Sequence, residues 1–170
     1  MEQMERTGIR EQAKVSMFTI VEPGTSSADG YEFWIFLPEQ IPAAWDELQP
    51  FVETALRYAH GEMLSADVKN LLLQGAFAAF AVVRYGKIQL VFICELCGWQ
   101  QYSSVRILLL AGKELAQATR FFPVFQSWVL SKGAVEIEAW TRPSMSRMLR
   151  SLGFNKSYDV VRFDLRSKLQ

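Results

Sequence analysis

Hydrophobic and polar positions follow two rhythms along the chain, and each rhythm predicts one kind of element. Alternating or short continuous runs of β-branched and aromatic residues predict strands, and apolar residues three and four apart predict helices. We expect strands over 15–21, 31–37, 77–83, 88–96, 105–110, 135–140 and 158–165. We expect helices over 42–59, 65–75, 114–131 and 144–152. This order predicts a mixed α/β or α+β domain with a mostly antiparallel sheet.

Proline and turn residues indicate where these elements begin or break. Pro50 should kink or divide the first helix, because proline lacks the N–H group that a helix interior needs. Pro123 should interrupt the third helix, with a kink or a late restart. Ser65 is expected to cap the second helix, and Tyr85-Gly86-Lys87 is typical of a tight hairpin turn.

The composition limits the classes of function. The 170 residues fit one globular unit, and a hydrophobic content of 50% excludes disorder as the main state. The 18 basic and 18 acidic residues balance, so we expect no nucleic-acid partner. No apolar run approaches the roughly 20 residues of a membrane span, and the charged start lacks a signal-peptide pattern. We therefore expect a soluble protein with no membrane partner.

Metal and disulfide chemistry have few candidate residues. His60 is the single histidine, and Cys94 and Cys97 are the two cysteines. Two cysteines cannot form a disulfide framework, and on a strand this spacing directs their side chains to opposite faces. We therefore expect no metal site.

The first 40 residues are expected to form an N-terminal arm and the first strands, ahead of a domain over 41–170 within one globular unit. A dense turn signal over 23–30 separates two strands in this part. The strand that carries Val15, Phe18 and Ile20 could add to the sheet edge of a partner. We therefore expect these three residues to bind a partner.

Three local sequences resemble the GNAT (Gcn5-related N-acetyltransferase) superfamily. They are Ile107–Lys113, which reads as strand, turn and helix start; Gly133 followed by the strand over 135–140; and Met148–Phe154, a helix that ends in Gly-Phe. The resemblance implies a GNAT-like acyl-CoA N-acyltransferase fold, with a central, mostly antiparallel twisted sheet flanked by helices.

A series of further pieces resembles a family of GNAT-like proteins that tailed bacteriophages encode, often among their virion structural genes. The pieces are Trp45, Asp67-Val68, Leu71-Leu72, Gly75, Glu95, Val105-Arg106-Ile107, Gly112, Trp128, Gly133, Glu136-Ile137-Glu138, Arg142-Pro143, Leu149 and Gly153-Phe154. This resemblance implies a virion or assembly protein, made in the host cytoplasm, that binds head or tail proteins or a second copy of itself. Such a protein would have lost acetyl transfer and would need no cofactor.

The GNAT resemblance also implies where an active member would bind acetyl-CoA. The cofactor lies between two central strands, and backbone N–H groups of a glycine-rich loop and the next helix bind its pyrophosphate. The family signature is Gln or Arg, two residues, Gly, one residue, and Gly or Ala. The matching loop here is Leu110, Ala111, Gly112 and Lys113, with one glycine and no Gln or Arg three positions before it. Glu114 would repel a phosphate, which Lys113 could partly offset, and Gly112 can instead be a simple turn glycine.

The catalytic residues of the family match this chain poorly. The tyrosine that acts as general acid falls on Leu149, which cannot donate a proton, and a common asparagine falls on Arg142. Glu95 is the candidate general base. Its alternative is a strand glutamate that faces solvent or pairs with an arginine.

Two exposed groups are candidate contact surfaces. Trp99 and Tyr102 lie in an expected loop, where they could form a contact surface, and Arg142 belongs to a basic cluster that could hold an anionic partner. Two functions stay open. One is the virion binding module, and the other is an active acetyl-CoA-dependent N-acetyltransferase of the cytoplasm that acts on a protein or a small amine.

Overall fold

The computed structural model describes residues 19–20, 29–59 and 61–165. Its strands are β1 (Thr19–Ile20), β2 (Tyr31–Phe36), β3 (Phe77–Arg84), β4 (Lys87–Gly98), β5 (Ser103–Gly112) and β6 (Glu136–Ala139). Its helices are α2 (Ile41–Leu56), α3 (Ser65–Leu73), α4 (Leu115–Ala118), α5 (Phe122–Ser131) and α6 (Pro143–Ser151), with the 3-10 turns η1 (Pro38–Gln40) and η2 (Thr119–Phe121).

The chain forms two compact units, which are residues 1–140 and residues 141–170. The first unit holds the sheet, and the second holds α6 and the segment after it. The division expected at residue 40 stays a prediction. Within the described ranges, every helix is too short or too polar to cross a lipid bilayer.

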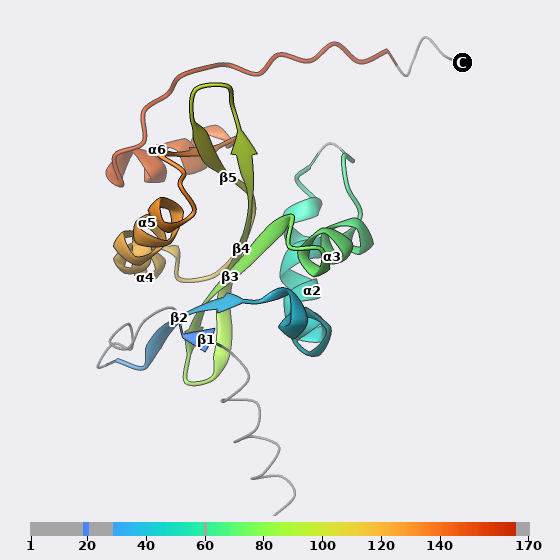
Figure 1. Cartoon of the computed structure of the whole chain (residues 1–170), viewed down its shortest axis with the longest axis vertical. Coiled ribbons are helices and arrows are strands. Elements are labelled where there is room, and N and C mark those ends of the chain that lie inside the picture. Colours follow the sequence, from blue (N-terminus) through green and yellow to red (C-terminus); the bar gives the residue numbers. More distant parts are fainter. Residues whose placement is uncertain (1–18, 21–28, 60, 166–170) are drawn as a thin grey trace, which may run out of the picture. The chain divides into compact units, whose positions relative to one another are not determined.

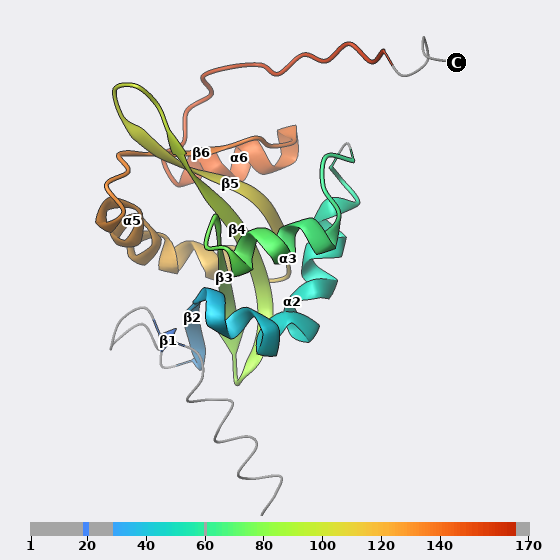
Figure 2. The same cartoon turned by 45° about the vertical axis from the view of Figure 1, so that its right-hand side comes forward.

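The described strands form one sheet in the order β1-β2-β3-β4-β5-β6 (Figures 1 and 2). Neighbours from β1 to β5 are antiparallel, and β6 runs parallel to β5. Helices α2 and α3 lie on one side of this sheet, and α4 and α5 lie on the other (Figures 1 and 2). The expected mixed fold with a mostly antiparallel sheet is therefore confirmed.

The core under α2 and α3 is mostly aliphatic, with four aromatic residues among its buried members: Trp34, Phe36, Trp45 and Phe77. Helix α2 buries Ile41, Leu48 and Val52, and α3 buries Val68 and Leu72. Their partners on the sheet are Ala79, Ala81, Val83, Val91, Ile93 and Leu109. Helix α2 lies mainly over β5 and β4, and α3 lies over β3.

The opposite face is an aromatic core. The rings of Phe80 and Phe92 stack at 4.8 Å, and Phe125 of α5 meets both edge-on at 5.2 Å and 5.0 Å. Phe33 and Phe121 stack at 5.5 Å in the same cluster. Because helices cover both faces, β3 and β4 read as apolar runs rather than as alternating strands.

Several local expectations differ from the structure. Pro50 does not divide α2, because Pro50 is exposed and the carbonyl group that it leaves unpaired can face water; the kink stays a prediction. Leu64, not Ser65, caps α3, and the Leu64 N–H donates to the Asp67 carboxylate at 2.8 Å. The interruption expected near Pro123 is confirmed, since η2 separates α4 from α5.

The last expected strand, over 158–165, is wrong for the described residues. This segment has neither helix nor strand, and its apolar side chains, such as Tyr158, Val161 and Phe163, are exposed. Alternating apolar residues suit a strand, but a strand also needs a neighbour that accepts its backbone hydrogen bonds.

Replacing Phe80 by alanine tests the aromatic core. Phe80 is 0% exposed and stacks on Phe92, so Phe80→Ala should lower the free energy of unfolding by about 3–5 kcal/mol. Urea denaturation followed by circular dichroism measures the change. Leu130→Ala, at an exposed position of α5, is the matched control and should stay within about 0.5 kcal/mol. Equal losses in both variants would contradict a core centred on Phe80.

Candidate functional site

The pairing between β5 and β6 ends halfway along β5. Their parallel pairing runs from Ser104↔Glu136 to Ile107↔Ala139, where β6 ends. Strand β5 continues to Gly112 with β4 beside it, and the register with β4 shifts at Ile93/Cys94, where Leu108 is the extra residue. Among the described strands, none pairs with the edge of β5 over 108–112 that faces away from β4. This open edge offers backbone N–H and C=O groups to an extended ligand.

The loop after β5 begins at Gly112, which packs against the backbone of β4. A Cβ atom there would lie 2.4 Å from the Gln89 carbonyl oxygen and 2.5 Å from the Leu90 Cα atom. The next N–H group, of Lys113, donates to the same Gln89 oxygen at 2.8 Å. Gly112 therefore serves a close approach between strands, and the Lys113 N–H is already engaged within the fold.

Glu114 completes this loop and turns back toward the sheet. Its backbone is left-handed, with φ of +58°, and its carboxylate accepts a hydrogen bond from the Tyr31 hydroxyl group. Arg84 Nη1 lies 3.8 Å from the Glu114 carboxylate. Of the four residues expected to bind the cofactor, Leu110 and Ala111 lie in β5, Gly112 ends it, and Lys113 lies in the loop.

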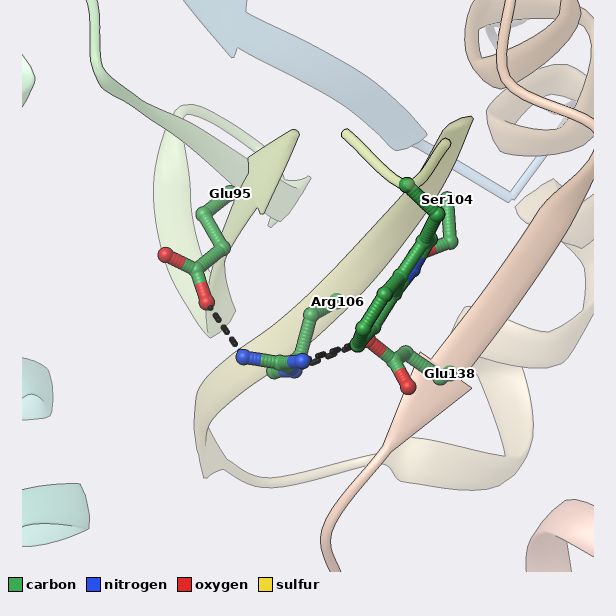
Figure 3. Close-up of polar contacts among 5 residues, drawn as sticks. Glu95, Ser104, Arg106 and Glu138 are labelled. Atoms are coloured by element: carbon green, nitrogen blue, oxygen red, sulfur yellow. Dashed lines mark hydrogen bonds and ion pairs between the residues drawn. The ribbon is translucent and has the colours of Figure 1, made fainter. Parts of the chain in front are cut away.

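A row of charged side chains crosses three strands at the point where β5 and β6 are still paired. The Arg106 guanidinium donates to Glu95 of β4 at 2.9 Å and to Glu138 of β6 at 2.8 and 2.9 Å (Figure 3). We call Glu95, Arg106 and Glu138 the charged row. Glu95 is thus paired with an arginine, and its role as a general base stays a prediction.

Polar and aromatic groups surround the charged row. The buried Ser104 hydroxyl lies 3.4 Å from Glu138 and accepts a hydrogen bond from the Trp99 indole at 3.1 Å. The Arg106 guanidinium lies 4.5 Å from the ring centre of Trp140. Trp99 and Trp140 are 52% and 59% exposed, so the row has aromatic surface beside it that faces solvent.

The charges of the row stabilise one another. Burial lowers the pKa of Arg106, but Cys97, Glu138 and Glu95 together raise it above its ordinary value. Arg106 therefore stays protonated. Glu136 lies two residues before Glu138 and faces the same side of the sheet. This side thus carries three carboxylates and one guanidinium.

The two cysteines do not form a reactive pair. Cys94 is buried and Cys97 is partly exposed, and both are free thiols. Burial, and then Glu95, raise the pKa of each thiol, so both stay protonated at neutral pH. Among the described residues, no group of three or more His, Cys, Asp or Glu side chains is placed to hold a metal ion.

The expected partner residues belong to different segments of the chain. Val15 and Phe18 lie outside the described residues, and Ile20 lies in β1. Tyr102 is 42% exposed beside Trp99, with the two rings 6.5 Å apart at the β4–β5 turn. Arg142 caps α6, and its carbonyl oxygen accepts hydrogen bonds from Met145 and Ser146. Their role in binding a partner stays a prediction.

Sequence reasoning missed Arg106, Ser104, Glu138 and Trp140 as site residues. A signal existed, because 104 and 106 on one strand and 136 and 138 on another are polar residues two apart. Polar residues at that spacing share a face. What the pattern lacks is the register that sets Arg106 against Glu138.

Replacing Gly112 by alanine tests the close approach between β4 and β5. The new Cβ atom would meet backbone rather than a movable side chain, so Gly112→Ala should lower the free energy of unfolding by about 2–4 kcal/mol. Thermal and urea unfolding measure it. Gly98→Ala is the control, because nothing lies within 4 Å of a Cβ atom there. A Gly112→Ala protein as stable as the control would refute the packing role.

Replacing Glu95 by glutamine tests the charged row. Arg106 would lose one of its two carboxylate partners, so the free energy of unfolding should fall by about 1 kcal/mol, a modest value because both groups are partly exposed. Urea unfolding measures the loss. Glu136→Gln, on the same face of the sheet, is the control and should change stability by less than about 0.5 kcal/mol. An unchanged Glu95→Gln stability would show that the ion pair contributes nothing.

Comparisons with known proteins identify the fold. No family model matches the chain, and no curated protein matches it in sequence. Solved structures match the chain in fold. An aminoglycoside acetyltransferase, meta-AAC0020, from an uncultured soil metagenomic sample, in complex with sisomicin, is 16% identical with a TM-score of 0.62. The match covers 79% of this chain and 95% of that one.

Two further structures agree. The aminoglycoside N-acetyltransferase AAC(6')-Iy in complex with CoA is 15% identical with a TM-score of 0.61, over 80% of this chain and 95% of that one. A possible acetyltransferase from Clostridium difficile 630 is 12% identical with a TM-score of 0.54, over 79% and 97%. Nothing in these structures points to a phage or a virion, so that part of the expectation has no support. The chain has the GNAT-like fold of these acetyltransferases.

Proposed function

We propose that this protein is an acetyl-CoA-dependent N-acetyltransferase that acts on a cationic amine. This proposal rests on the end of the pairing between β5 and β6 at Ile107. It leaves the β5 edge over 108–112 free to pair with the amides of an extended acyl-CoA arm. Among the structures with the same fold, AAC(6')-Iy was solved with CoA. The shared fold and the unpaired edge of β5 support acetyl-CoA as the cofactor.

The charge of the adjacent sheet face supports a cationic acceptor. Three carboxylates and one guanidinium give this face a net charge of about minus two. The carboxylates belong to Glu95, Glu136 and Glu138, and the guanidinium belongs to Arg106. Trp99 and Trp140 add exposed rings, whose faces attract cations. A small amine with more than one positive charge fits these features better than a neutral amine.

The reaction needs a neutral amine beside the thioester. The amine nitrogen attacks the acetyl carbonyl carbon, a C–N bond forms, and the C–S bond to CoA breaks. The attacking nitrogen loses its proton, and we propose the carboxylate of Glu95 as the acceptor. Leu149, which matches the family's general acid in sequence, has no proton to donate. We propose that the thiolate leaves as an anion and takes its proton from water.

The contacts of the loop after β5 favour a second function. The Lys113 N–H is engaged with Gln89, and Glu114 places a carboxylate in the loop where a pyrophosphate would lie. This favours a binding module without acetyl transfer, for which the phage resemblance suggests virion proteins as partners. We rank this function second, because it leaves the open β5 edge without a role.

Titration calorimetry with acetyl-CoA and CoA tests the proposal. We expect micromolar binding, followed by CoA release when a dicationic amine is added, measured as free thiol. Glu138→Gln should raise the KM for the dication about tenfold and leave the KM for a monoamine unchanged. Glu53→Gln, on the exposed side of α2, is the control. The absence of binding at millimolar cofactor would refute acetyl transfer and favour the binding module.

A further inference from the structure

Two arginine side chains flank one tyrosine ring where the loop after β5 begins. Arg84 ends β3 and pairs in register with Tyr31, the first residue of β2. The Arg84 guanidinium lies 4.9 Å from the Tyr31 ring centre, and that of Arg120 in η2 lies 5.3 Å from it. Tyr31 is 3% exposed, so its ring is a fixed support for both cations. We call Arg84, Arg120 and Tyr31 the arginine pair site.

The carboxylate of Glu114 enters this site. It accepts a hydrogen bond from the Tyr31 hydroxyl group and lies 3.8 Å from Arg84 Nη1. Arg120 is paired with Asp29 at 2.9 and 3.0 Å. Among the described residues, Arg84 Nε is a buried nitrogen without a hydrogen-bond partner. Arg84 can therefore still accept an anion that offers more oxygen atoms than one carboxylate does.

The backbone of Glu114 has an uncommon conformation that its contacts maintain. A φ of +58° is uncommon for a residue with a Cβ atom, and such strain persists only where the surroundings hold it. The Glu114 carboxylate contacts Tyr31 and Arg84, and the Glu114 carbonyl oxygen accepts hydrogen bonds from the N–H groups of Gln117 and Ala118. An anion that displaced the carboxylate would therefore leave the backbone hydrogen bonds to α4 in place.

We infer that Glu114 occupies the arginine pair site as an internal competitor and lowers the affinity of the protein for a phosphate-bearing ligand. This inference rests on the proposed function, in which the ligand is the diphosphate portion of CoA. The site adjoins Gly112 and Lys113, where the open edge of β5 ends. Guanidinium groups suit phosphate because their N–H donors match its oxygen atoms in pairs.

The local charge gives the size of the effect. Three cationic side chains and two carboxylates give this region a net charge of plus one. The cations are Arg84, Arg120 and Lys113, and the carboxylates are Asp29 and Glu114. Without the Glu114 carboxylate the net charge is plus two. Removing a partly exposed anion that competes for the same arginine should strengthen phosphate binding about tenfold. The gain should shrink as salt rises.

Calorimetry with CoA and with inorganic pyrophosphate, on the full chain, tests the inference. Glu114→Gln keeps the shape of the side chain, and Glu114→Gly suits the left-handed backbone, so at least one variant should fold like wild type. Both should bind CoA about tenfold more tightly than wild type. In an Arg84→Gln background the same substitutions should give no gain. Glu53→Gln, on α2, is the matched control and should bind like wild type.

The outcomes separate this inference from the proposed function. If wild type binds CoA and the Glu114 variants bind it equally, the inference is overturned and the proposed function stands. If a Glu114 variant binds CoA and wild type does not, the competitor is confirmed. If all variants are folded by circular dichroism and none binds at millimolar CoA, both the inference and the proposed function fail. A gain that survives Arg84→Gln would also overturn the inference, since the arginine would then be irrelevant.

Discussion

The burial of both faces of the central strands is the constraint on which the rest of the first unit depends. Strand β3 places alanine and valine under α2 and α3 and Phe80 against α5. Because helices exclude water from both faces of the central strands, charged side chains lie where the helices no longer cover the sheet. The charged row of Glu95, Arg106 and Glu138 occupies such a position, and the sheet keeps it rigid.

Most elements were predictable because their signals are local. Apolar runs, hairpin residues and helical stripes describe a segment by itself, and the positions of β3, β4 and α3 follow from them closely. Pro50 differs because its effect depends on which way the helix faces. The segment over 158–165 differs because a strand needs a partner, which its own residues do not encode.

The site was less predictable because its contacts join distant residues. Glu114 meets Tyr31 across 83 positions, and Arg106 meets Glu138 across 32. A sequence shows that these residues are polar or charged, but the pairing of strands decides which of them meet. Glu95 was found as a candidate through the resemblance to the GNAT superfamily, while its arginine partner became visible only with the register.

The point where β6 ends also limits the length of an extended ligand on β5. One guanidinium joins β4, β5 and β6 immediately before the last paired residues, Ile107 and Ala139. Beyond them β5 stays paired with β4, but among the described strands none pairs with its other edge over 108–112, about 16 Å at the usual rise of a strand. An extended molecule that pairs with this edge from the Gly112 end can therefore advance only to Ile107, where β6 already occupies the edge. The end of β6 thus sets the depth of the opening.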